Sequence, residues 1–336
     1  SGIASGSADL GGSKTHSNPY RNRNARTMLA SRRTLLKAIA AATVSGAATG
    51  LAFKPANCAT VGPLQRRIST TGEEVPVVGL GSWITFNVGN DPVLLDESAA
   101  VIAAFFEDGG RMIDSSPMYG SSQSTIGYGL RKLGYPQQLF SADKVWTSLP
   151  SAGPQQMEDT RSKWGVQKLD LMQVDNLLSW EEHLDMLKAR KAAGEIKYIG
   201  VTTSHGRRYN ALEQIMKSQD IDFVQITYNI IDRQAEARLL PLARERRSGV
   251  IVNRPYQRGD LISRFSGEAL PSWAGEIGAS SWAQFLLKFI IGHTAVTCAI
   301  PATTRVDHVR ENLATAAGIL PDEATRRRMA EYVGQL

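Results

Sequence analysis

The chain has 336 residues, of which 42% are hydrophobic and 21% are charged. This composition supports a buried core, so it excludes wholesale disorder, a collagen-like repeat and a polytopic membrane protein. The length fits about two average domains, or one barrel of about 250 residues with an additional segment.

The net charge of +6 is concentrated at the N-terminus. Residues 1–60 carry eight Lys or Arg and one acidic residue, whereas residues 61–336 carry 30 basic and 31 acidic residues. We therefore expect no nucleic-acid partner. Two cysteines are too few for a disulfide framework, and the five histidines show no ligand spacing, so we expect no metal site.

Residues 1–60 are interpreted as a disordered n-region followed by an export signal. Residues 31–37 read SRRTLLK and precede a mild apolar run at 38–53, a pattern that resembles a twin-arginine signal peptide. The run is too short and too broken for a spanning helix, which needs about 20 apolar residues. We expect the twin-arginine translocation machinery to bind residues 31–53. Cleavage near 52–62 would leave an exported, periplasmic protein with no stable membrane span; an N-terminal anchor and a basic loop before an amphipathic helix are the alternatives.

Residues 61–336 alternate short apolar runs with longer helical patterns. Helical spacing of apolar residues is clear at 94–107 and at 183–193. We predict eight strands at 75–79, 111–115, 143–148, 170–175, 198–202, 223–228, 250–254 and 297–301. Strands separated by helices pair in parallel through crossovers, and eight such units close into a (β/α)8 TIM barrel, so residues 61–336 are expected to form one α/β domain.

Functional residues of such barrels lie at the C-terminal ends of the strands. Asp114 ends the second predicted strand, Tyr119 follows it, and Lys144 lies in the third. Asp175 and Asn176 come at the end of the fourth strand. These side chains are therefore expected at one rim.

The segment from Ile113 to Gly120 reads IDSSPMYG and, with Lys144 about one unit later, resembles the aldo/keto reductase family. The resemblance covers about residues 66–333 and includes GLGSW, GEIKYIGV, QITYN and IPATTRVDHVREN. It implies an oxidoreductase in which Tyr119 donates a proton. A nearby ammonium from Lys144 would lower the pKa of the phenol, and Asp114 would hold Lys144 charged.

The fourth catalytic position departs from the family. Where the family pattern reads QVHN, this chain reads QVDN, with Asp175 in place of His. An ionised Asp175 opposes a developing oxyanion, whereas a protonated one can donate a hydrogen bond. The resemblance associates a carboxylic acid here with reduction of a conjugated C=C bond. Three interpretations remain open: a slower carbonyl reductase, an altered reaction such as that one, and a nucleotide-binding barrel with little turnover.

No G-x-G-x-x-G motif opens a βαβ unit, which argues against a Rossmann fold. The family resemblance implies NADP(H) extended over the rim instead. It assigns the nicotinamide end to Thr202, Thr203, Gln225 and Arg254, and the phosphate and adenine end to Thr303, Thr304, Arg305, Glu311 and Asn312.

Trp83, Trp146 and Asn176 are candidates for the substrate pocket. The sequence as a whole predicts an exported NADP(H)-dependent reductase of a small aldehyde, ketone or quinone.

Overall fold

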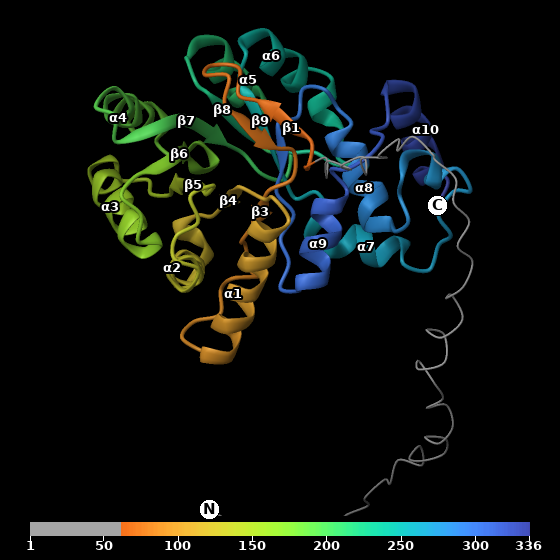
Figure 1. The fold of residues 1–336 in the computed structure, drawn as a ribbon. Coiled ribbons are helices and arrows are strands. Elements are labelled where there is room, and N and C mark those ends of the chain that lie inside the picture. The colour runs from red at the N-terminus through yellow and green to blue at the C-terminus, as the bar shows by residue number, and fades with distance from the viewer. Residues whose placement is uncertain (1–61) are drawn as a thin grey trace, which may run out of the picture. The chain divides into compact units, whose positions relative to one another are not determined.

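Eight parallel strands lie side by side in the computed structural model, which describes residues 62–336 (Figure 1). They are β3 (Leu80–Gly81), β4 (Met112–Asp114), β5 (Phe140–Val145), β6 (Leu169–Val174), β7 (Ile196–Thr202), β8 (Phe223–Thr227), β9 (Gly249–Asn253) and β10 (Cys298–Ala299). Parallel bridges from Val78 to Ala299 and from Gly81 to Ala302 join the first and last strands. A Cβ at Gly81 would lie 2.6 Å from the carbonyl oxygen of Ile300, so glycine allows this close approach.

Helices surround the strands on the outside (Figure 1). They are α1 (Pro92–Glu107), α2 (Ser122–Lys132), α3 (Gly153–Trp164), α4 (Trp180–Ala192), α5 (Tyr209–Ser218), α6 (Leu239–Arg246), α7 (Asp260–Phe265), α8 (Trp282–Ile291), α9 (Val306–Ala314) and α10 (Glu323–Val333). The predicted (β/α)8 barrel is confirmed. The interpretation of residues 1–60, including the signal at 31–53, concerns a part of the chain outside the described residues.

Two predicted strands are misplaced. The segment 75–79 overlaps the second strand of an antiparallel hairpin, formed by β1 (Gln65–Arg67) and β2 (Glu74–Pro76), and the first barrel strand starts later, at Leu80. The predicted strand 143–148 begins three residues earlier and ends at Val145. The start of β5 was missed because the prediction relied on apolar runs, and Ser141 and Asp143 are buried polar residues of this strand.

Inward-facing residues alternate along each strand, as the period of two requires. At the N-terminal end of the barrel they are mostly apolar and belong to one buried cluster: Met112, Phe140, Ala142, Leu171, Tyr198, Phe223, Ile251 and Cys298. Ile68 and Val75 of the β1–β2 hairpin and Ile300, which also lines the cavity described below, complete this cluster. Two residues beyond Met112 comes Asp114, two beyond Ala142 comes Lys144, and two beyond Phe223 comes Gln225. The same alternation therefore fills the barrel with apolar side chains and places polar ones at its C-terminal end.

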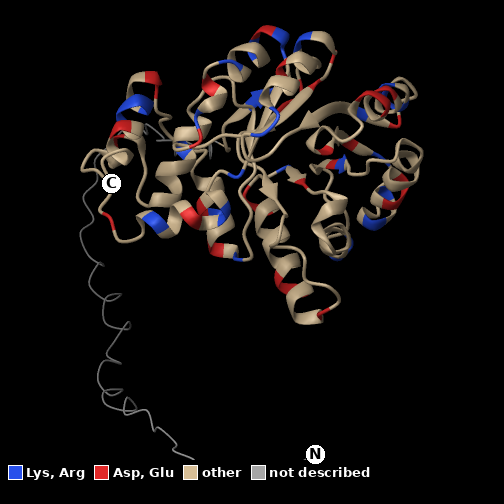
Figure 2. Ribbon diagram, turned by 180° about the vertical axis from the view of Figure 1, so that it is seen from behind, with Lys and Arg blue, Asp and Glu red and all other residues tan. Residues whose placement is uncertain are grey.

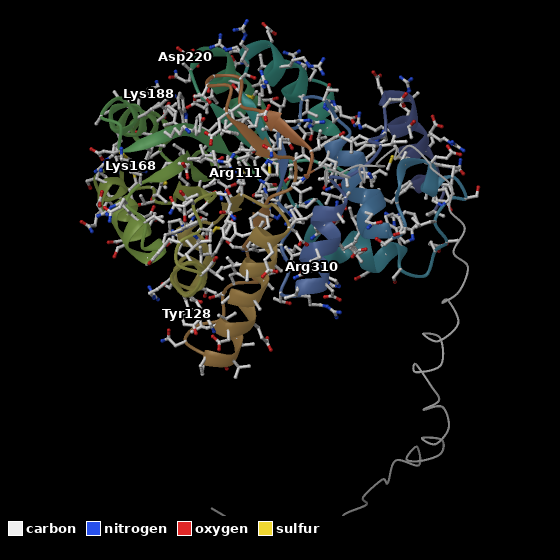
Figure 3. The ribbon with its side chains drawn as sticks, in the orientation of Figure 1. Arg111, Tyr128, Lys168, Lys188, Asp220 and Arg310 are labelled. Carbon is white, nitrogen blue, oxygen red and sulfur yellow. The ribbon has the colours of Figure 1, made fainter. Side chains whose placement is uncertain are left out.

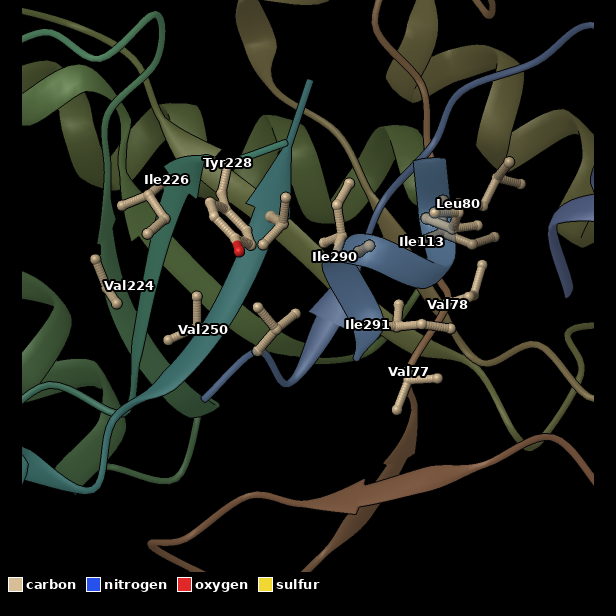
Figure 4. Close-up of a cluster of buried hydrophobic side chains, with 14 of the residues drawn as sticks. Val77, Val78, Leu80, Ile113, Val224, Ile226, Tyr228, Val250, Ile290 and Ile291 are labelled. Carbon is tan, nitrogen blue, oxygen red and sulfur yellow. The ribbon is translucent and has the colours of Figure 1, made fainter. Parts of the chain in front are cut away.

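A second apolar layer lies between the strands and the helices. Figure 4 shows Ile290 and Ile291 of α8 in this layer with strand residues such as Val224, Ile226 and Val250, all of which are buried. Burial of each such side chain stabilises the fold by about 1.5–3 kcal/mol before the cost in conformational entropy.

The β1–β2 hairpin lies against the N-terminal end of the barrel. The hydroxyl of Thr71 is 2.6 Å from that of Tyr198, whose ring is fully buried in the barrel, and Tyr198 donates a hydrogen bond of 2.7 Å to Glu73. The hairpin therefore covers the N-terminal end of the barrel, and the C-terminal end is open.

Positive and negative side chains are interspersed over the outer elements (Figure 2). Figure 3 shows Lys168, Lys188 and Asp220 pointing away from the strands. Within residues 62–336, no helix combines the length and the apolar character needed to cross a membrane.

Candidate active site

A cavity of about 510 Å³ lies at the C-terminal end of the barrel. Its size is typical of small-molecule sites. It brings together most of the residues predicted from the sequence: Trp83, Asp114, Tyr119, Lys144, Asp175, Asn176, Thr202, Gln225, Arg254, Thr303, Glu311 and Asn312.

Asp114 and Lys144 form a buried ion pair at the floor of this cavity. Nζ of Lys144 lies 2.5 Å from Oδ1 of Asp114 and donates a second hydrogen bond of 2.7 Å to the carbonyl of Ser115. Both residues are 1% exposed. Burial alone lowers the pKa of Lys144, but the attraction of Asp114 outweighs it and the pKa lies above its ordinary value. Lys144 is therefore a fixed positive charge.

Tyr119 ends a 3-10 turn, Pro117–Tyr119, that follows β4. Nζ of Lys144 lies 5.4 Å from the centroid of its ring, and the ring of Trp83 lies 6.5 Å away, centroid to centroid. Burial raises the pKa of Tyr119 well above 10, and the opposite effect of Lys144 does not offset it. The expected lowering by Lys144 is present, but the net direction predicted from the sequence is wrong because burial dominates. Tyr119 stays protonated and can donate.

Three donors surround the carboxylate of Asp175, which is 2% exposed. Ser116 Oγ donates to Oδ2 at 2.7 Å. Asn176 Nδ2 and Thr202 Oγ1 donate to Oδ1 at 2.8 and 3.1 Å. We call Ser116, Asn176 and Thr202 the Asp175 cage. Asn176 also adopts a left-handed backbone, with φ of 50°, which asparagine tolerates better than most residues.

Gln225 and Thr203, predicted for the nicotinamide end, lie in different environments. Nε2 of Gln225 donates to Oδ2 of Asp114 at 2.9 Å. Thr203 is 1% exposed and does not line the cavity, and its Oγ1 has no hydrogen-bond partner among the described residues.

Two arginines and a histidine line the part of the cavity wall that follows β9 and β7. Arg254 and Arg258 face the cavity with His205, and the guanidinium of Arg258 lies 4.3 Å from the ring centroid of Trp83. Burial, together with Arg254 and neighbouring arginines, lowers the pKa of His205. Clustered guanidinium groups fit the phosphates of a dinucleotide.

The segment after β10 contributes only part of its predicted residues. Thr303, Glu311 and Asn312 line the cavity, whereas Thr304 and Arg305 do not. The guanidinium of Arg305 is bound to Asp307, with Nε 2.9 Å from Oδ1. Arg305 is thus engaged outside the cavity.

The sequence predicts Trp146 as a substrate-pocket residue, but the structure does not place it in the cavity. It is 40% exposed and is absent from the cavity lining. Its backbone N–H and carbonyl are both bound to the side chain of Gln156, at 2.6 and 2.9 Å. Because β5 ends at Val145, Trp146 belongs to the following loop rather than to the inner face of a strand.

Ser116 and Arg258 were missed by sequence reasoning. The Ser-Pro pair at 116–117 signals a turn, and Ser116 caps it by accepting the N–H of Met118. Its bond to Asp175 spans 59 residues of sequence and left no local pattern. Arg258 lies over Trp83 at the cavity wall, and no local sequence pattern distinguishes it from Arg328, which lies over Trp273 outside the cavity.

The strand order and the rim site define a (β/α)8 barrel with its cavity at the C-terminal end. The family model described as "Aldo/keto reductase family" matches residues 77–328. The chain therefore belongs to the aldo/keto reductase family.

Similar proteins span most of the barrel. Methylglyoxal reductase YeaE of Escherichia coli is 26% identical over 258 residues, covering 74% of this chain and 89% of that protein. The aldo-keto reductase of Klebsiella pneumoniae solved with NADPH aligns with a TM-score of 0.68 at 20% identity, covering 80% of this chain and 95% of that one. Glycerol dehydrogenase of Gluconobacter oxydans aligns with a TM-score of 0.69 at 17% identity, covering 81% and 95%. The two structural matches show the fold.

Proposed function

We propose that this chain is an NADP(H)-dependent oxidoreductase that reduces a small aldehyde, ketone or quinone. The observation that carries the proposal is the buried Asp114–Lys144 ion pair next to the ring of Tyr119 in one cavity. A protein that only binds a nucleotide has no need of a phenol held beside a fixed ammonium.

The nicotinamide cofactor supplies a hydride to the substrate carbon when it is bound. Tyr119 donates the proton that the substrate oxygen requires. The positive charge of Lys144 stabilises the phenolate that remains, and Asp114 holds that charge in place.

The cofactor assignment follows the family resemblance, and six of its nine residues line the cavity. We propose that Thr202, Thr203, Gln225 and Arg254 hold the nicotinamide end. Thr303, Thr304, Arg305, Glu311 and Asn312 are proposed for the phosphate and adenine end. The arginines that follow β9 support binding of an anionic dinucleotide. The Klebsiella relative was solved with NADPH, whereas one E. coli relative is named NADH-specific methylglyoxal reductase, so both nucleotides belong in the test.

The first experiment measures oxidation of NADPH and of NADH by the full chain with an aldehyde, a ketone, a quinone and an enone. Tyr119→Phe is expected to lose at least about 100-fold in kcat, the usual contribution of a general acid. Tyr128→Phe is the matched control, because Tyr128 lies on α2 and its hydroxyl contacts Asp96 away from the cavity. Nucleotide binding without consumption of any substrate would overturn the reductase and favour a binding barrel. Turnover of the enone alone would favour C=C reduction.

We also propose export to the periplasm through the twin-arginine pathway, on the pattern at residues 31–53. Replacing Arg32 and Arg33 together by Lys should retain the full chain in the cytoplasm in cell fractionation. Unchanged export of that variant would refute the proposal.

A further inference from the structure

The Asp175 carboxylate is held as an acceptor. Ser116 Oγ accepts the N–H of Met118 at 3.2 Å, so its own proton is directed to Asp175. Thr202 Oγ1 likewise accepts the N–H of Asn176 at 3.0 Å and donates to Asp175.

The side-chain amide of Asn176, the third donor of the Asp175 cage, is also oriented by a neighbour. Oδ1 of Asn176 accepts the hydroxyl of Ser204 at 3.1 Å, which orients the amide so that Nδ2 faces Asp175. Ser116, Thr202 and Asn176 therefore each direct a donor at the carboxylate of Asp175.

One acceptor position on the carboxylate is left for the cavity. Oδ1 accepts two hydrogen bonds, whereas Oδ2 accepts only the one from Ser116, among the described residues. Asp175 lines the cavity together with Tyr119 and Lys144. A group that reacts beside Tyr119 therefore lies in the field of a negative charge.

The negative charge of Asp175 affects a carbonyl and a protonated imine in opposite ways. A carbonyl oxygen moves from neutral toward −1 during hydride addition, which a nearby carboxylate opposes. The nitrogen of a protonated imine moves from +1 to neutral, and a carboxylate that accepts its N–H keeps the C=N group in the protonated, electrophilic form.

We propose that Asp175 makes this site favour a protonated C=N substrate, an iminium, over a carbonyl. The proposal rests on the hydride-transfer function proposed above. A hydride supplied by the reduced nicotinamide nucleotide forms the new C–H bond, and the π pair of the C=N bond moves onto nitrogen. The protonated imine and reduced nucleotide thus become a neutral amine and oxidised nucleotide.

The rest of the cavity is compatible with such a substrate. Trp83, Met118 and Ile262 supply apolar surface for the carbon skeleton. Arg254 and Arg258 follow β9, three strands away from β6, and Arg258 lies over the ring of Trp83. Lys144 is paired with Asp114 at 2.5 Å, which offsets its repulsion of a cation.

The experiment compares 2-methyl-1-pyrroline, a small cyclic imine, with cyclopentanone as substrates of the full chain and NADPH. It is run on the unaltered protein and on the Asp175→Asn, Asp175→His and Asp185→Asn variants. Asp185→Asn is the matched control, because it removes the same charge from an exposed position on α4. Calorimetry also measures binding of pyrrolidinium, a stable cation of the same shape, to the NADP⁺-loaded proteins.

We expect the unaltered protein and Asp185→Asn to prefer the imine in kcat/KM. Asp175→Asn should lose about 30-fold or more in pyrrolidinium affinity, as expected when one partner of a buried charge pair is truncated. Asp175→His should shift the preference toward cyclopentanone. Equal use of both substrates, or pyrrolidinium binding that Asp175→Asn leaves unchanged, would overturn the inference while leaving the reductase intact. Failure to consume NADPH with any substrate would overturn the proposed function, and the binding measurement would still test the role of Asp175.

Discussion

Asp143 and Lys144 are consecutive residues of β5 whose side chains belong to different buried networks. Lys144 binds Asp114 inside the barrel at 2.5 Å. Asp143 accepts the indole N–H of Trp164 at 2.7 Å, the amide of Gln123 at 3.1 Å and the backbone N–H of Lys144 at 2.7 Å. One strand thus positions the active-site lysine and ties its backbone to helices α2 and α3.

Burial raises the pKa of Asp143 to about 7. In the unfolded chain this carboxyl ionises near its ordinary value of about 4, so between these values the folded chain keeps a proton that the unfolded chain has lost. The contribution of Asp143 to stability is therefore highest at low pH and falls as pH rises from about 4 to about 7. We expect Asp143→Asn to remove this part of the pH dependence, on the order of a few kcal/mol, in urea unfolding measured across that range.

Asp159→Asn is a suitable control for Asp143→Asn, because Asp159 is exposed on α3. In Asp159→Asn, the free energy of unfolding should decrease between about pH 4 and pH 7 as it does in the unaltered protein. If Asp143→Asn keeps the same pH dependence of the free energy of unfolding, Asp143 is already ionised in the folded state at acidic pH.

The sequence predicted the features that depend on periodicity and order. Alternating inward positions identify Asp114 and Lys144 as neighbours at the rim, and the fold rule places Tyr119 and Asp175 beside them. Contacts between distant segments were not predictable, since Ser116 reaches Asp175 across 59 residues.

Local ambiguity explains the remaining errors. The hairpin strand Gln65–Arg67 has three residues and no buried alternation, so nothing in the sequence separates it from a loop. The net pKa shift of Tyr119 depends on its burial, which the sequence pattern does not report.

The raised pKa of Tyr119 predicts the alkaline behaviour of the enzyme. Because burial keeps the phenol protonated, kcat/KM should show no loss assigned to Tyr119 between about pH 6 and pH 10. The measurement is a pH profile of kcat/KM with saturating NADPH and the best substrate. A decline with an apparent pKa below 10 that disappears in Tyr119→Phe would contradict the direction of the shift.

Arg258 is expected to contribute to nucleotide affinity. Its guanidinium lies over Trp83 at the cavity wall, and loss of one charge-assisted contact corresponds to about tenfold or more in Kd. Fluorescence titration should show this loss of NADPH affinity in Arg258→Met, together with a weaker dependence on salt. Arg310→Met serves as the control, since Arg310 is half exposed on α9 and paired with Glu107. An equal effect of the two substitutions would mean that Arg258 acts only through net charge.

The Asp114–Lys144 pair should be costly to break and less costly to remove. Lys144→Met leaves the carboxylate of Asp114 buried without its cation, so we expect a loss of about 3–5 kcal/mol in the free energy of unfolding. Combining Asp114→Asn with Lys144→Met removes both charges and should recover most of that loss in urea unfolding. Because both variants lack the ammonium beside Tyr119, we expect both to lose reductase activity. Lys188→Met, which breaks the exposed pair with Asp185, should change stability by less than about 1 kcal/mol. If Lys144→Met is no less stable than Lys188→Met, the buried pair does not stabilise the barrel. If the double variant keeps full activity, the pair has no role in proton donation by Tyr119.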